Sequence, residues 1–63
     1  MNIERLKELL AEKNITQAQL SEMVGVSQAF ISYVLNGYKV PSVAVIKNIA
    51  AHLGVSVDEL IAE

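Results

Sequence analysis

The sequence predicts an all-α fold, a compact domain of five short helices, and three observations support this prediction. Capping residues (Asn, Thr or Ser) precede five stretches whose apolar residues have helical spacing. A glycine, the usual helix terminator, follows three of them, at positions 25, 37 and 54. No stretch alternates between apolar and polar residues over the length of a strand. With 63 residues, no cysteine and 52% hydrophobic residues, we expect a single domain (residues 1–63) stabilised by aliphatic packing.

The first two helices are defined by their N-caps. Asn2 precedes a helix over about residues 3–13, where apolar residues are spaced i, i+3 and i+7. Thr16 precedes a second helix over residues 17–24. Gln19 stands three positions after Thr16, and the two are expected to form a capping box.

The remaining three helices follow the same pattern. Ser27 is the expected cap of a third helix over about residues 28–36. Ser42, directly after a proline, is expected to begin a fourth. Ser56 and Glu59 have the spacing of a second capping box, which would open a short last helix.

The charges are unevenly distributed. The net charge of −2 argues mildly against a nucleic-acid partner, but between residues 23 and 57 the only Lys, Arg, Asp, Glu or His residues are Lys39, Lys47 and His52. The acids lie on either side of that segment: Glu4, Glu8, Glu12, Glu22, Asp58, Glu59 and Glu63. A mildly positive face on an acidic body is therefore possible.

The third helix has one face suited to hydrogen bonding. On a helical wheel, five residues fall within an arc of roughly 140°: Gln28, Ala29, Ser32, Tyr33 and Asn36. An outward face selected for solubility alone would favour Lys and Glu, whereas Gln can bond adenine through two atoms and Ala can contact a thymine methyl group. The alternative is a polar surface that lacks charge by chance; DNA recognition is the favoured interpretation.

No pattern indicates an enzyme. His52 is the only histidine and has no cysteine or carboxylate placed to form a metal or catalytic site with it. A glycine-rich phosphate loop is also lacking. We expect no cofactor, metal, small-molecule ligand or membrane segment, and the absence of cysteine fits a cytoplasmic location.

The segment ITQAQLSEMVGVSQAFISYVLNG resembles the helix-turn-helix (about residues 17–36) of the phage lambda-repressor/Cro (Xre-like) family of DNA-binding transcriptional regulators. Ser21 is small where the third helix would cross closely, and Gly25 stands where the turn needs a left-handed residue. The resemblance continues through N-G-x-x-x-P-S and I-x-x-I-A-x-x-L-G-V-S-x-x-E-L, so it covers nearly the whole chain.

The resemblance implies roles for individual residues. The positions that would contact bases are Gln28, Ala29, Ser32 and Tyr33. Those that would contact phosphates are Gln17, Ser27, Asn36, Lys39 and Ser42. Gln17 would also brace Gln28. The expected partner is double-stranded DNA with a pseudo-palindromic site.

Three departures from the family pattern are visible. Leu10 and Leu35 replace an Arg–Glu pair, which reads as an ion pair exchanged for packing. Phe30 replaces a small polar residue, and packing at the core edge is a better explanation for it than base contact. Fewer Lys and Arg surround the third helix, which lowers the expected affinity for DNA.

Members of this family commonly pair as homodimers, and several apolar residues lie where such an interface would form: Val40, Val43, Val55, Val57 and Ile61. The same residues could equally pack the core. The resemblance implies a repressor or regulator that binds DNA as a dimer. The alternative is a protein-interaction module of the same fold, antitoxin-like or an assembly partner, with weak or no DNA binding.

Overall fold

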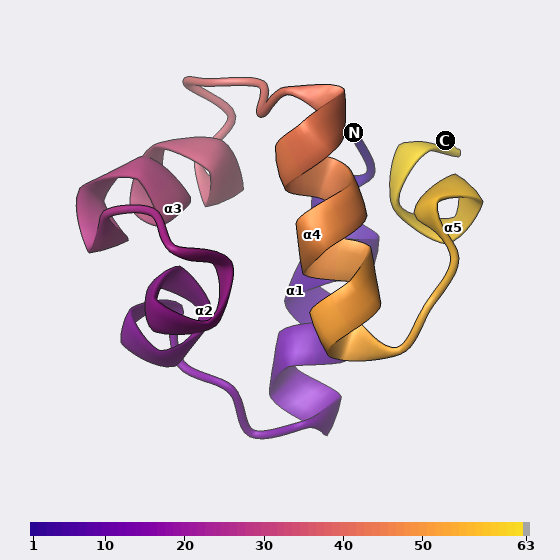
Figure 1. Ribbon diagram of the computed structural model, residues 1–63, viewed down its shortest axis with the longest axis horizontal. Coiled ribbons are helices and arrows are strands. Elements are labelled where there is room, and N and C mark those ends of the chain that lie inside the picture. The colour runs from indigo at the N-terminus through magenta and orange to yellow at the C-terminus, as the bar shows by residue number, and fades with distance from the viewer. Residues whose placement is uncertain (63) are drawn as a thin grey trace.

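The computed structural model describes residues 1–62, which form five helices joined by short loops (Figure 1). The helices are α1 (Ile3–Glu12), α2 (Gln17–Val24), α3 (Gln28–Leu35), α4 (Val43–Leu53) and α5 (Val57–Ile61). Residues 1–62 contain no strand. The predicted all-α, five-helix architecture is confirmed.

Each helix begins at the cap that the sequence predicts. The side chains of five residues accept the backbone N–H three positions later: Asn2, Thr16, Ser27, Ser42 and Ser56. At Thr16 the capping box is complete, because the Gln19 side chain also accepts the Thr16 backbone N–H at 2.9 Å. Local hydrogen bonding therefore fixes where every helix begins.

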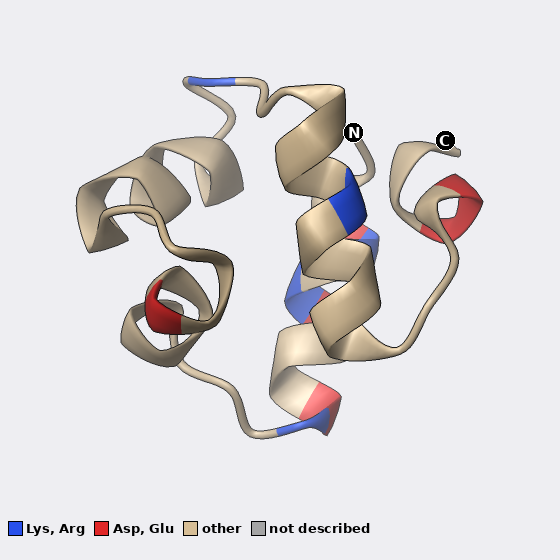
Figure 2. Ribbon diagram, in the orientation of Figure 1, with Lys and Arg blue, Asp and Glu red and all other residues tan. Residues whose placement is uncertain are grey.

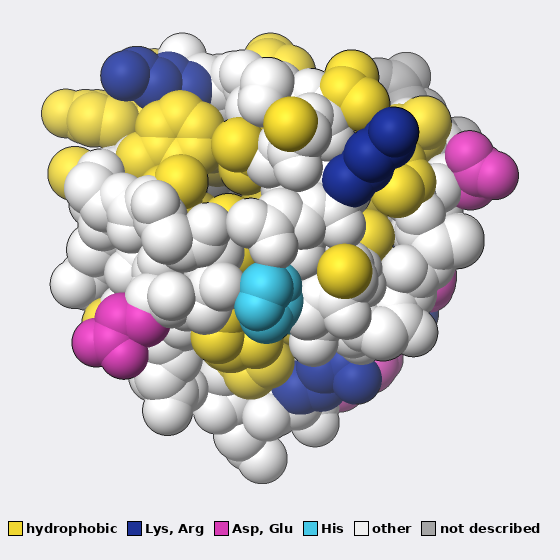
Figure 3. Space-filling model, in the orientation of Figure 1, with side chains coloured by type: hydrophobic (Ala, Val, Ile, Leu, Met, Phe, Trp, Pro, Cys, Tyr) yellow, Lys and Arg dark blue, Asp and Glu magenta, His cyan; other side chains and the backbone are white. Residues whose placement is uncertain are grey.

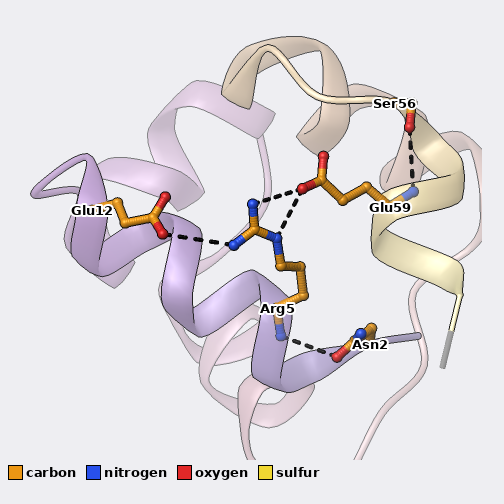
Figure 4. A network of polar contacts seen from close by, with 5 residues as sticks. All are labelled: Asn2, Arg5, Glu12, Ser56 and Glu59. Carbon is orange, nitrogen blue, oxygen red and sulfur yellow. Dashed lines mark hydrogen bonds and ion pairs between the residues drawn. The ribbon is translucent and has the colours of Figure 1, made fainter.

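The capping box predicted at Ser56 is only half formed. Ser56 Oγ accepts the Glu59 N–H at 3.3 Å, but the Glu59 carboxylate is used elsewhere (Figure 4). Arg5 of α1 donates to Glu59 Oε1 through Nε at 2.8 Å and Nη2 at 2.6 Å. A charged donor forms a stronger bond than the backbone amide, so Glu59 joins α5 to α1 instead.

The Arg5 guanidinium also lies 3.6 Å from Glu12 Oε1, on its own helix. The hydrogen bond to Glu59, followed by the attraction of the nearby carboxylates, raises the pKa of Arg5 above its already high value. Arg5 therefore stays charged in both folded and unfolded chains at any ordinary pH. The contact between α1 and α5 gains no pH dependence from Arg5.

Two helices end one residue earlier than predicted. Lys13 and Asn36 are C-caps rather than last helical residues. After Lys13 the chain leaves the helix through Asn14, which adopts a positive φ of 55°. Asn is the residue other than glycine that best tolerates this conformation.

The core receives side chains from every helix. Its most deeply buried members are Leu6, Leu20, Ile31, Val34, Ile49, Leu53 and Leu60. Ser21 is 6% exposed, which fits the expectation that a small residue is needed beside α3. Asn48 of α4 donates its amide to the Val24 carbonyl at 3.0 Å, which ties α4 to the end of α2. α2 is thereby held against α4, and α3 packs against α2 at one side of the molecule (Figure 1).

Candidate nucleic-acid interface

The two faces of α3 are divided as the helical wheel predicts. Ile31, Val34 and Leu35 are buried. The opposite face comprises Gln28, Ala29, Tyr33 and Asn36, which are exposed, and Ser32, which is half-buried. The structure thus presents two amides, a hydroxyl, a methyl group and a phenol on one side of a single helix.

Two serine caps, Ser27 at the start of α3 and Ser42 at the start of α4, keep a hydrogen-bond donor. Ser27 Oγ accepts the Phe30 N–H at 3.0 Å, and Ser42 Oγ accepts the Val45 N–H at 3.3 Å. Both residues are exposed. Because a hydroxyl can accept and donate at once, each serine can cap its helix while its O–H bonds a phosphate oxygen.

The expected brace between Gln17 and Gln28 is not formed. No hydrogen bond joins these two side chains, and both residues are exposed to solvent, where water competes for amide groups. Gln17 stands at the first position of α2 and Gln28 at the first position of α3. Both therefore offer free amides at helix starts.

Asn36 is already engaged with α3. Its Nδ2 donates to the Ser32 carbonyl at 2.8 Å and lies 3.4 Å from Ser32 Oγ. A phosphate contact by Asn36 would have to share or break these bonds. A phosphate contact by Asn36 would therefore cost more free energy than one by Ser27 or Ser42.

Lys39 lies over the aromatic side chains of α3. Its Nζ is 5.4 Å from the centre of the Tyr33 ring and 5.9 Å from that of Phe30, which are cation–π distances. The Lys39 backbone N–H also donates to the Tyr33 carbonyl at 3.3 Å, so the loop turns back onto the helix. Phe30 is half-buried and packs against the core, as its position at the edge of the buried arc predicts. Nothing in the sequence indicates that Phe30 also contacts Lys39.

The charges around α3 favour a polyanion. No acidic residue lies on α3, on the loop after it or on α4, whereas α1, α2 and α5 carry acids (Figure 2). Lys39 is in the middle of that loop, and Lys47 is on α4. The uneven charge distribution in the sequence thus leaves α3, the loop after it and α4 without acids.

A family model described as helix-turn-helix matches residues 6–60 of the chain. The chain belongs to the Cro/C1-type helix-turn-helix family. This confirms the resemblance of the sequence to the lambda-repressor/Cro regulators. No curated protein and no solved structure matches the chain significantly.

Membership of this family makes the protein a DNA-binding helix-turn-helix regulator in the general sense, and the family is not one of enzymes. Within residues 1–62, no three His, Cys, Asp or Glu side chains gather where they could hold a metal ion. Nor does this part of the chain contain a helix long and apolar enough to cross a membrane.

The residues suggested for a dimer interface fall into two groups. Val40, Val43 and Ile61 are 80%, 64% and 46% exposed. Val55 and Val57 are half-buried and pack against the core instead. Apolar side chains are visible on the surface near the top of Figure 3. Tyr38, in the same loop as Val40, is 79% exposed.

Proposed function

We propose that this protein is a sequence-specific regulator, most simply a transcriptional repressor, which inserts α3 into the major groove of double-stranded DNA. The observation that carries the proposal is the exposed face of α3. It offers side chains that donate and accept hydrogen bonds, with no charge among them. Such side chains can distinguish base edges by their pattern of donors and acceptors, whereas contacts to phosphates carry no direct sequence information.

In this arrangement Gln28, Ala29, Ser32 and Tyr33 contact bases. The phosphates on either side of the groove are met by Gln17, Ser27, Asn36, Lys39 and Ser42. Four of these five residues are uncharged and contribute hydrogen bonds without releasing a counterion. One subunit is therefore expected to bind weakly and with modest salt dependence.

Useful affinity then requires two subunits. We propose a homodimer that places its two α3 helices in major grooves about one DNA turn apart, on a pseudo-palindromic site. Exposed Val40, Val43 and Ile61 support this part of the proposal, because isolated apolar side chains of this size gain free energy when a partner covers them. A cytoplasmic location belongs to the same proposal.

Selection of binding sites from random DNA, followed by salt titration of the selected duplex, tests the function. Enrichment of one pseudo-palindrome, bound more tightly than a scrambled duplex at every salt concentration, is the expected result. If no sequence is enriched even at low salt, α3 does not read bases. The protein-interaction module of the same fold would then be the better account.

A further inference from the structure

A surface hollow of about 460 Å³ lies beside the proposed DNA-binding face, between α1, the start of α2 and the end of α3. Leu10, Ile15 and Leu35 form its apolar lining. Its polar lining comes from Lys7, Thr16, Gln17 and Asn36. Gln17 and Asn36 are two of the proposed phosphate contacts, and the fold brings Lys7 of α1 to the same place.

Lys7 is a free positive charge in this hollow. It is exposed and forms no ion pair with any of residues 1–62. Glu4 and Glu8 share its helix but do not line the hollow. Glu12 of α1 and Glu59 of α5 are both engaged by Arg5.

The hydrogen-bonding groups of the hollow are suited to an anion. Lys7 can supply ammonium donors, and the Gln17 amide makes no hydrogen bond within the described chain. Thr16 Oγ1 accepts the Gln19 N–H, which leaves its hydroxyl hydrogen free to donate. No carboxylate lines the hollow to compete for these donors.

A second hollow has a different composition. About 410 Å³ in volume, it is lined by Lys13 and Glu22 together with Asn14, Ile15, Gln19 and Met23. One cation and one anion face the same space there. Lys13 is therefore a suitable control: it is the C-cap of α1, the helix that carries Lys7, but it shares its hollow with the acidic residue Glu22.

We infer that the hollow lined by Lys7, Thr16, Gln17 and Asn36 binds a backbone phosphate of the DNA, and that Lys7 is the residue that neutralises it. This inference rests on the proposed function and adds to it a charged contact from α1. Lys7 would compensate in part for the few Lys and Arg residues around α3, since each neutralised phosphate releases counterions.

The test compares Lys7→Gln with Lys13→Gln, which change the net charge equally, on the duplex selected by the wild-type protein. Lys7→Gln should weaken binding by roughly fivefold or more at 0.1 M salt, and should flatten the plot of log K against log salt by about 0.9 per subunit. Lys13→Gln should change the slope by much less. Thermal unfolding of both variants checks that each is folded.

A scan with neutral methylphosphonates identifies the phosphate. At one position in each half-site, the substitution should weaken wild-type binding but have little further effect on Lys7→Gln. Equal slopes for the two variants, or no such position, would overturn the inference while leaving the proposed function standing. Failure of the wild-type protein to select any DNA would instead remove the proposed function itself.

Discussion

Lys39 provides the positive charge nearest to the exposed face of α3, and two aromatic rings determine where that charge lies. A cation over an exposed ring is stabilised by about 0.5–1 kcal/mol, which is comparable with thermal energy. The contacts with Tyr33 and Phe30 thus favour one region for Nζ without locking it there. A phosphate at this end of α3 can recruit Lys39 at little cost.

We predict that Lys39→Ala weakens binding to every DNA sequence, because it removes a phosphate contact and no base contact. The salt slope should fall by about 0.9 per subunit, with sequence preference unchanged. Fluorescence titration on a selected and a scrambled duplex measures both quantities. Lys47→Ala, the same change on α4, is the control and should have a smaller effect. A change in base preference for Lys39→Ala would contradict its assignment to phosphate.

At the scale of elements, the turn between α2 and α3 sets the angle at which α3 is presented. Gly25 ends α2 with φ of 81° and ψ of 32°, the left-handed conformation. A Cβ added there would meet nothing within 4 Å. The requirement for glycine is therefore conformational and does not come from crowding.

Gly25→Ala is expected to lower the free energy of unfolding by about 1–2 kcal/mol, the cost of placing an L-residue in this region. Gly25→Asn should cost less, because Asn tolerates the conformation better. Gly54, with φ of 71° and equally open surroundings, is the matched control at the end of α4. Chemical denaturation should find similar losses for Ala at both glycines. A neutral Gly25→Ala would show that the backbone is not held in this conformation.

The helices were predictable because their signals are local. A cap such as Thr16 bonds Gln19, and a terminator such as Gly25 bonds Ser21, so each signal acts within four residues and is visible in the local sequence. The division of α3 into a buried and an exposed face likewise follows from the 3.6-residue helical period alone. The predicted faces agree with the observed burial for that reason.

Contacts between distant elements could not be predicted in this way. Glu59 has the spacing of a capping residue, yet its carboxylate bonds Arg5, 54 positions away. The same applies to Lys7, which only the folded chain brings beside Gln17. In each case the local sequence allows more than one partner for the side chain, and the packing of distant helices decides which partner it meets.

For the molecule as a whole, three of the residues suggested for a dimer interface, Val40, Val43 and Ile61, are exposed to solvent. We predict that Val40→Asp weakens dimer formation, because it would bury a charge against an apolar surface. The stability of the monomer should change little, since Val40 is 80% exposed. Sedimentation with and without DNA measures the association of subunits. The control is Ala11→Asp, which makes the same change of charge at an exposed position of α1. Unchanged association would place the dimer contact elsewhere.

The central claim, that α3 reads bases in two half-sites, is tested most directly by selecting sites with the wild-type protein and with Gln28→Ala in parallel. Gln28 is at the start of α3 and exposed, so its loss should not unfold the domain. Base preference should weaken at one position of each half-site, related by the symmetry of the palindrome, by about 1–3 kcal/mol of discrimination. Identical selected sites for the two proteins would contradict the account.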